Sequence, residues 1–230
     1  MTTLDTQSIH AILIDIDGTI ADTDDALATR VERWIRILRP SLPDQDVHAA
    51  ARTFVMRIET PVNTLVGWFD RTGLDQLIGP IMDMLHRLRG ISGRSQTHLV
   101  PGVQPALERL ADHYPLGIVT AREHRSAISI LNAHALDPLF QCIATARTCS
   151  RAKPHPAPVL WAVDQIGASP EHCLMVGDTT ADILAGKSAG CQTVGVLCGF
   201  GERSELEMAG ADLILNSTAD LADLLLGPDL

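Results

Sequence analysis

Short runs of consecutive apolar residues recur along the chain, and longer stretches with helical spacing of apolar and polar residues separate them. The runs are rich in β-branched residues and too short for helices. Such runs are typical of strands buried on both faces of a parallel sheet. The predicted strands are Ala11–Ile14, Leu116–Val119, Cys173–Val176, Thr193–Leu197 and Leu213–Leu215.

The stretches between these runs carry their apolar residues on one face of a helix. Gly190 stands where the C-cap of a helix is expected, and Pro105 suits a first helical turn. The alternation of strands and helices predicts a doubly wound parallel α/β sheet, that is, a Rossmann-like core. The predicted helices are Gln104–Asp112, Glu123–His134, Ala157–Ile166, Thr180–Ala189 and Ser217–Leu226.

One long interval after the first strand shows helical periodicity and no strand pattern. Leu27, Val31 and Trp34 share one helical face there, and several prolines punctuate the block. An interval of this length between neighbouring strands is too long for a loop. We therefore expect an all-helical cap domain over residues 21–96, inserted into an α/β core formed by residues 1–20 and 97–230.

Charge and hydropathy narrow the possible partners and the cellular location. The formal net charge of −10 argues against nucleic acid and against an anionic membrane surface. No uninterrupted apolar stretch reaches the roughly 18 residues that span a bilayer, and the amino terminus does not have the pattern of a signal peptide. We expect a cytoplasmic protein, monomeric or homodimeric.

The five cysteines do not suggest a metal or redox site. No two of them have a C-x-x-C spacing, so neither zinc binding nor a redox motif is indicated. We expect them to be buried, reduced thiols.

Polar residues follow the predicted strands at the points where the strands end. Asp15 follows the first strand, Thr120 the second, and Asp178 comes just after the strand that begins at Cys173. The carboxyl ends of parallel strands lie along one edge of the sheet, where such folds bind ligands. Lys153, just ahead of a predicted helix, is placed to reach the same edge.

This set of residues suits phosphoryl transfer. A carboxylate such as Asp15 can attack phosphorus, and Asp15 and Asp178 supply oxygen ligands for Mg²⁺. Asp17, two residues further on, is placed to act as a general acid and base. Thr120 and Lys153 can hold the phosphoryl oxygens, and Gly18 lets the backbone approach them.

Four segments also resemble, in order, the four motifs of the haloacid dehalogenase-like hydrolases. The resemblance covers the whole predicted core, and the predicted helical insertion is similar to the cap of many members. The nearest likeness is to the phosphoglycolate phosphatase-like members. The segments are Asp15-Ile16-Asp17-Gly18-Thr19, Thr120, Lys153-Pro154 and Gly177-Asp178-Thr179-Thr180-Ala181-Asp182.

The resemblance implies a role for each matching residue. Asp15 would be the nucleophile and Asp17 the acid/base, while Asp178 and the main-chain carbonyl of Asp17 would bind Mg²⁺ with Asp15. Asp182 would support the metal site more loosely. The remaining motif positions, expected to contact the substrate, are Gly18, Thr19, Ala121 and Arg122. Members often have a small or amide residue after the second-motif threonine, whereas here Ala121 is followed by Arg122, which is a departure.

For some of these residues a purely structural role stays open at this point. Thr120 can be an ordinary helix N-cap, and Asp182 an acid that stabilises the first turn of a helix. Gly199 and Gly201, on either side of Phe200, resemble a phosphate loop only superficially. We interpret that segment as a plain connection.

The predicted function is a Mg²⁺-dependent phosphatase that hydrolyses a small phosphorylated metabolite through an aspartyl phosphate on Asp15. Phosphoglycolate, a sugar phosphate and pyrophosphate all stay open as substrates. A sugar phosphomutase or a pyrophosphatase on the same core is the alternative, although Thr19 favours hydrolysis over the mutase. A dehalogenase is disfavoured by Asp17, and a phospho-aspartate signalling domain by the order of the acidic residues along the chain.

Overall fold

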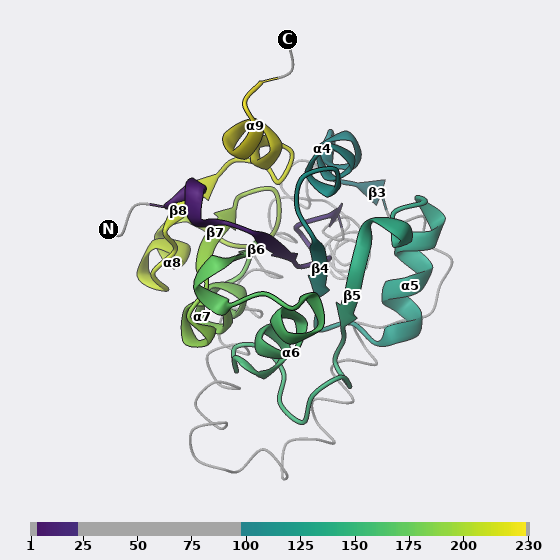
Figure 1. Ribbon diagram of the computed structural model, residues 1–230, viewed down its shortest axis with the longest axis horizontal. Coiled ribbons are helices and arrows are strands. Elements are labelled where there is room, and N and C mark those ends of the chain that lie inside the picture. Colours follow the sequence, from purple (N-terminus) through teal and green to yellow (C-terminus); the bar gives the residue numbers. More distant parts are fainter. Residues whose placement is uncertain (1–3, 23–97, 229–230) are drawn as a thin grey trace, which may run out of the picture. The chain divides into compact units, whose positions relative to one another are not determined.

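The computed structural model describes residues 4–22 and 98–228, which form a six-stranded parallel sheet with helices on both faces (Figure 1). The strand order is β5-β4-β1-β6-β7-β8, so the first strand lies at the centre. The strands are β1 (Ala11–Ile14), β4 (Leu116–Val119), β5 (Phe140–Ala144), β6 (Cys173–Gly177), β7 (Gln192–Val196) and β8 (Leu213–Leu215). The predicted doubly wound sheet is confirmed.

Each predicted helix that falls in the described ranges is present, with shifts of up to three residues at its ends. Two helices, α6 and α7, match the prediction residue for residue. The helices are α4 (Val103–Ala111), α5 (His124–Ala133), α6 (Ala157–Ile166), α7 (Thr180–Ala189), α8 (Arg203–Met208) and α9 (Asp220–Leu226). Three short 3₁₀ turns accompany them at Thr6–Ser8, Asp137–Leu139 and Pro170–His172.

The central strand shows how the sheet separates two hydrophobic cores. Ile12 and Ile14 point into the core that α4, α5 and α9 cover, whereas Ala11 and Leu13 point into the core that α6 and α7 cover. All four side chains are fully buried, because successive strand residues face opposite sides of a sheet that is covered on both. This double burial is why β1 appears in the sequence as an uninterrupted apolar run.

The sequence analysis missed β5 and α8, each for a physical reason. β5 is an edge strand in which Gln141 is exposed, so it lacks the continuous apolar run that marks the central strands. α8 is short and polar, and Leu206 is its one buried residue. Both elements owe their conformation to neighbours distant in sequence more than to a local pattern.

A two-stranded antiparallel ribbon lies where the predicted cap leaves and re-enters the core. It pairs β2 (Ala21–Asp22) with β3 (His98–Leu99). The chain divides into two compact units, one formed by Met1–Asp22 with Thr97–Leu230 and the other by Thr23–Gln96. The predicted cap, residues 21–96, lies outside the described residues apart from Ala21 and Asp22, and its helical content stays a prediction.

Two further sequence expectations concern cysteines and membranes. Cys142, Cys173 and Cys191 are buried thiols as predicted, but Cys149 and Cys198 are only half-buried, and all five are free. Within residues 4–22 and 98–228, no helix has the length and apolar character needed to cross a membrane.

Candidate active site

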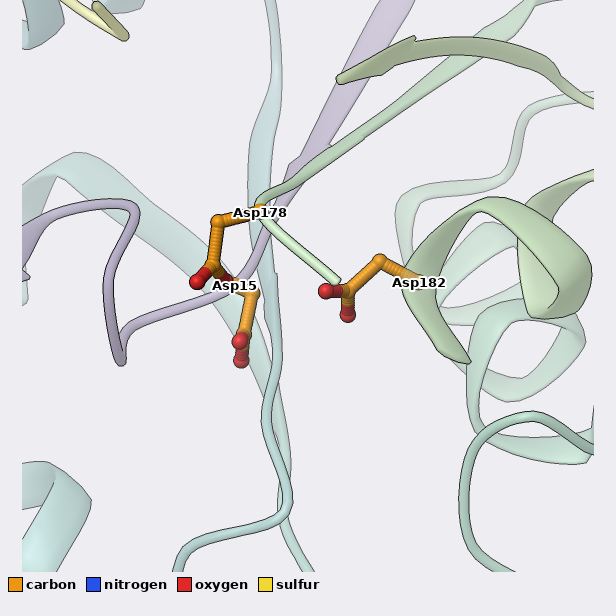
Figure 2. A group of neighbouring side chains, drawn as sticks. All are labelled: Asp15, Asp178 and Asp182. Atoms are coloured by element: carbon orange, nitrogen blue, oxygen red, sulfur yellow. The ribbon is translucent and has the colours of Figure 1, made fainter. Parts of the chain in front are cut away.

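Three buried carboxylates meet at the carboxyl edge of the sheet (Figure 2). Asp15 follows β1, Asp178 follows the neighbouring strand β6, and Asp182 lies in the first turn of α7. One oxygen from each lies within 4.8 Å of the others. The prediction that these strand ends share one edge is therefore confirmed for this acidic cluster.

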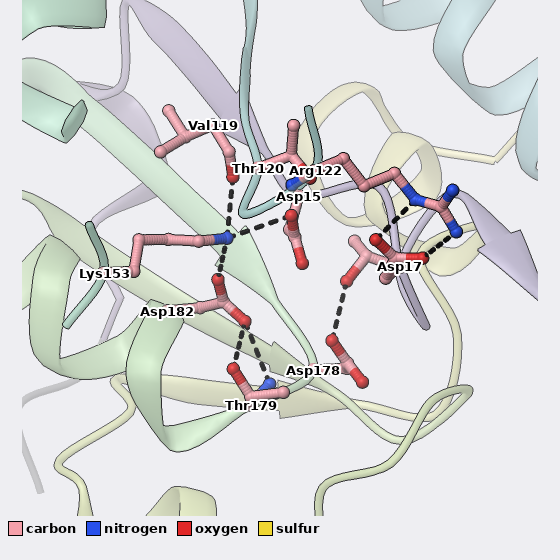
Figure 3. Close-up of polar contacts among 10 residues, drawn as sticks. Asp15, Asp17, Val119, Thr120, Arg122, Lys153, Asp178, Thr179 and Asp182 are labelled. Carbon is pink, nitrogen blue, oxygen red and sulfur yellow. Dashed lines mark hydrogen bonds and ion pairs between the residues drawn. The ribbon is translucent and has the colours of Figure 1, made fainter. Parts of the chain in front are cut away.

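Lys153 lies among these acids and neutralises part of their charge (Figure 3). Its Nζ is 2.9 Å from Asp15 Oδ1 and 2.5 Å from Asp182 Oδ1, and it donates a 2.7 Å hydrogen bond to the carbonyl of Val119. Only 6% of its side chain is exposed. Lys153 is therefore a buried part of the site, not a solvated surface charge.

Burial raises the pKa of two of the acids. The pKa of Asp15 rises to about 7, mainly because its carboxyl group is removed from water, although the ammonium group of Lys153 opposes the rise. Burial, together with Asp182 and Asp15, raises the pKa of Asp178 well above its ordinary value. Burial alone would lower the pKa of Lys153, but Asp15 and Asp182 raise it above its ordinary value, which keeps the ammonium charged.

The donor set fits a hard divalent cation. When all three carboxyl groups are ionised they carry more negative charge than one ammonium neutralises, which contributes to the raised pKa values of Asp15 and Asp178; a divalent cation would compensate this charge. Asp15 Oδ1 contacts Lys153 as an ion pair, yet within the described residues it accepts no aligned hydrogen bond. A buried oxygen of this kind is costly unless it has a partner, and carboxylate oxygens are the ligands that Mg²⁺ prefers.

Asp178 is held by two loops that follow strands. The Phe200 N–H donates a 2.8 Å hydrogen bond to Asp178 Oδ2, and the Thr19 hydroxyl donates a 3.3 Å hydrogen bond to Oδ1. A Cβ atom on Gly18 or on Gly199 would lie 2.2 Å from Asp178 Oδ2. The interpretation of residues 199–201 as a plain connection was therefore incomplete, because this segment packs against Asp178. The glycines on both sides of Phe200 were the only sequence signal.

Replacing Gly199 by alanine should weaken Mg²⁺ binding about 10- to 100-fold. The new Cβ would lie 2.2 Å from Asp178 Oδ2 and 2.5 Å from the Gly18 carbonyl oxygen, so the carboxylate must move away from the Phe200 N–H. Losing a charge-assisted hydrogen bond costs about 1.5–3 kcal/mol, and each 1.4 kcal/mol is tenfold in affinity. Isothermal titration calorimetry with Mg²⁺ measures the change.

Gly167→Ala provides the control for this variant. Gly167 has a φ of +75° at the C-cap of α6, and a Cβ there meets nothing within 4 Å. The control should lose about 1–2 kcal/mol of stability through backbone strain while keeping native Mg²⁺ affinity. Native Mg²⁺ affinity in Gly199→Ala would mean that the packing of this loop does not position Asp178.

Asp182 caps a helix, as one interpretation of it predicted, and also forms an ion pair with Lys153; its support of a metal stays a prediction. Its Oδ2 accepts hydrogen bonds from the N–H and the hydroxyl of Thr179, at 3.0 and 2.7 Å, which caps α7. Its Oδ1 forms the ion pair with Lys153. The same carboxylate therefore stabilises the start of the helix and fixes the position of Lys153.

The loop after β4 carries the second predicted motif. Thr120 is buried, and its Oγ1 accepts a 3.2 Å hydrogen bond from the Arg122 N–H. The N-cap of α5 is Glu123, so Thr120 is not a helix cap. Ala121 is exposed.

Arg122 forms a two-point ion pair with Asp17 across the strand ends (Figure 3). Its Nε donates a 2.6 Å hydrogen bond to Asp17 Oδ2, and its Nη2 donates to Asp17 Oδ1. Its Nη1 donates a 3.0 Å hydrogen bond to the hydroxyl of Ser126. The sequence analysis placed both charged residues near the substrate but did not foresee this pair, since no local pattern joins two loops so far apart in the chain.

The fold and the site define a class of protein: a Rossmann-like α/β core with an acidic cluster and a buried lysine at the carboxyl ends of its strands. The chain belongs to the haloacid dehalogenase-like hydrolases, whose family model matches residues 12–196. The resemblance seen in the four motifs is thereby confirmed.

Individual relatives agree with this assignment. The chain is 31% identical to a protein named pyrophosphatase PpaX from Anoxybacillus flavithermus, over 95% of this chain and 97% of the relative. It is 27% identical to a phosphoglycolate phosphatase from Photorhabdus laumondii, over 97% and 95% of the two chains. A haloacid dehalogenase-like family protein from Streptococcus pneumoniae has the same fold, with a TM-score of 0.68, 23% identity, and coverage of 95% and 99%.

Proposed function

We propose that this protein is a Mg²⁺-dependent phosphatase that transfers the phosphoryl group of a small phosphorylated metabolite to Asp15 and then to water. The enzyme class, a phosphoric monoester hydrolase, follows from the family and from relatives named phosphatases. The observation that carries the proposal is the buried cluster of Asp15, Asp178 and Asp182 around Lys153. A cluster of this kind can hold a metal ion and a phosphoryl group side by side.

Asp15 is the proposed nucleophile. One of its oxygens is held by Lys153, so the carboxyl group is fixed in orientation before a substrate arrives. Mg²⁺, held by Asp15, Asp178 and the main-chain carbonyl of Asp17, would screen the repulsion between the carboxylate and the phosphoryl group. Attack of Asp15 on phosphorus forms an acyl phosphate and releases the leaving-group oxygen.

Two groups are proposed to hold the transferred phosphoryl oxygens. The ammonium group of Lys153 stays charged at the floor of the site, and the hydroxyl of Thr120 lies at the end of the strand beside β1. Fixed donors of this kind stabilise the charge that develops in the transition state. Gly18, with a φ of +68°, and Thr19 form the turn on which the phosphoryl group would rest.

Asp17 is the proposed general acid and base. As an acid it would protonate the leaving oxygen, and as a base it would take a proton from the water that attacks the acyl phosphate. Its side chain is 30% exposed, in contrast to the buried Asp15, so water and leaving groups can reach it. The two carboxylates therefore have environments suited to different tasks.

Removal of the metal tests the proposal most directly. With p-nitrophenyl phosphate and excess Mg²⁺ the protein should release p-nitrophenolate, and EDTA should reduce the rate to background. Readdition of Mg²⁺ should restore it. A protein that hydrolyses none of a broad panel of phosphate esters with Mg²⁺, or whose rate does not respond to EDTA, would contradict this function.

A pyrophosphatase is the second candidate, because the relative that is 31% identical carries that name. Pyrophosphate presents the same phosphoryl group as an ester, with phosphate as the leaving group. A comparison of kcat/KM for pyrophosphate and for a panel of phosphate esters decides between the two.

The metal-free protein should lose stability as the pH rises from about 4 to 7. The folded state holds a proton on Asp15 up to about pH 7, whereas in the unfolded chain this carboxyl group ionises near pH 4. Between these values the folded state binds more protons than the unfolded state, so unfolding becomes easier as the pH rises. Burial also raises the pKa of Asp178, which likewise lowers the stability of the folded protein as the pH rises.

The measurement is the melting temperature in EDTA at several pH values, compared with Asp15→Asn, in which this titration is removed. The difference between the two proteins isolates the contribution of Asp15 from that of the histidines. Mg²⁺ should stabilise the native protein more at pH 8 than at pH 5, because it binds the ionised form. The idea fails if native and Asp15→Asn have the same pH profile without metal.

A further inference from the structure

The proposed phosphoryl chemistry does not account for all the hydrogen-bond donors of Arg122. A guanidinium group has five N–H donors in a planar fork. Nε and Nη2 each give one N–H to Asp17, and Nη1 gives one to Ser126. Among the described residues no hydrogen-bond partner remains for the other two, one N–H on Nη1 and one on Nη2.

These two N–H groups belong to the two terminal nitrogens, which together can face a carboxylate or a phosphate in a bidentate contact. Asp17 and Ser126 meanwhile hold the guanidinium through its other three N–H groups. The side chain of Arg122 is 24% exposed, so the group is accessible without leaving Asp17. The arginine is thus fixed in orientation and retains one N–H donor on each terminal nitrogen for a further anion.

Arg122 lies in a loop at the same edge of the sheet as the proposed phosphoryl site. Arg122 lies two residues after Thr120, at the end of β4, and reaches Asp17 in the loop after the adjacent strand β1. Lys153, by contrast, is 6% exposed and already bound to Asp15, Asp182 and the Val119 carbonyl. The two cations therefore have separate tasks, one at the floor of the site and one at its accessible side.

We propose that Arg122 is a specificity-determining residue that binds a second anionic group on the leaving portion of the substrate. The substrate class is then a phosphate ester or anhydride whose leaving group carries its own carboxylate or phosphoryl group. This inference rests on the proposed phosphatase function and adds the chemistry of the leaving group. In a chain with a net charge of −10, a fixed cation at the site also offsets the repulsion that such an anion meets.

Matched substrates test the assignment. The first probe is 2-phosphoglycolate, the second is pyrophosphate, and the third is 2-hydroxyethyl phosphate, which resembles the first but has a neutral hydroxyl in place of the carboxylate. The native enzyme should prefer at least one anionic probe over the neutral ester by about 10- to 100-fold in kcat/KM, the range of one charge-assisted contact. A comparison of kcat/KM for 2-phosphoglycolate and for pyrophosphate tells whether a carboxylate or a phosphoryl group is recognised.

Arg122→Gln should remove this preference, measured as the ratio of kcat/KM for the anionic and the neutral probe, because a general loss of turnover through Asp17 affects both probes and cancels in the ratio. Arg122→Lys should keep only part of the preference because it lacks the planar fork. Arg125→Gln is the charge-matched control: it changes an exposed arginine on α5, the helix that begins two residues after Arg122, and should keep the native ratio. A native enzyme without the preference, or a preference that persists in Arg122→Gln, would overturn the inference.

A binding measurement separates this inference from the proposed function. Phosphonoacetate and methylphosphonate cannot be hydrolysed at a phosphate ester bond, and only the first carries a carboxylate. Calorimetry in the presence of Mg²⁺ should give tighter binding of phosphonoacetate, and Arg122→Gln should abolish the difference. If no ester is hydrolysed, the proposed function fails, yet this comparison still decides the role of Arg122. Equal affinities for the two phosphonates in the native protein would count against it.

Discussion

Asp15→Asn should lower phosphatase turnover by about 10⁴-fold or more, the range in which loss of a catalytic nucleophile falls. The amide is a poor nucleophile toward phosphorus, and it offers Mg²⁺ no negative charge. It also leaves Lys153 with one carboxylate partner, Asp182, in place of two. Steady-state rates with p-nitrophenyl phosphate and saturating Mg²⁺ measure the loss.

The variant should nevertheless fold. Burial raises the pKa of Asp15 to about 7, which means that the folded protein already favours a neutral side chain at this position. The melting temperature of metal-free Asp15→Asn at pH 8 should therefore equal or exceed that of the native protein. Inactivity in a stable protein separates a chemical role from a structural one.

Acid quenching and intact-mass spectrometry complete this test. The native enzyme, quenched during turnover, should carry one added phosphoryl group, and Asp15→Asn should carry none. Asp164→Asn changes an exposed acid on α6 and should behave as the native enzyme does. Turnover of Asp15→Asn near the native rate, or a phosphoryl group on the variant, would assign the nucleophile to another residue.

The fold was largely predictable because its central strands are buried on both faces. The central strands β1 and β4 were predicted residue for residue, and the residues at the ends of β1 and β6 could be placed together by topology alone. The edge strand β8 was also predicted residue for residue, because its three residues are all apolar. β5 could not be predicted in this way, because the exposed Gln141 interrupts its apolar run at the edge of the sheet.

The contacts that complete the site depend on loop conformation, which the sequence pattern does not encode. The hydrogen bond from Phe200 to Asp178 and the ion pair of Arg122 with Asp17 both join loops that follow different strands. Residues 17 and 122 are 105 positions apart, so only the finished sheet brings them together. Sequence reasoning identified which residues meet at the edge, and the structure supplies which of them bind to each other.

Asp17→Asn should separate the two chemical steps. p-Nitrophenolate leaves without needing a proton, so phosphorylation of Asp15 should partly survive in this variant. Hydrolysis of the acyl phosphate still needs a base to activate water, so that step should slow by about 10²–10⁴-fold, the usual worth of general acid–base assistance. The variant should therefore release a burst of p-nitrophenolate near one equivalent per active site, followed by slow turnover. Intact-mass spectrometry should find the phosphoryl group that accumulates.

Arg122, the ion-pair partner of Asp17, provides the control for the burst expected of Asp17→Asn. Asp17→Asn also removes the carboxylate that orients Arg122, and a disturbed arginine is a second possible cause of slow turnover. Arg122→Gln disturbs the same pair but keeps the carboxylate of Asp17, so it should show no burst with p-nitrophenyl phosphate. A burst in both variants would mean that the ion pair, and not the carboxylate as a base, governs the second step. Steady turnover of Asp17→Asn at the native rate would mean that another group transfers the proton.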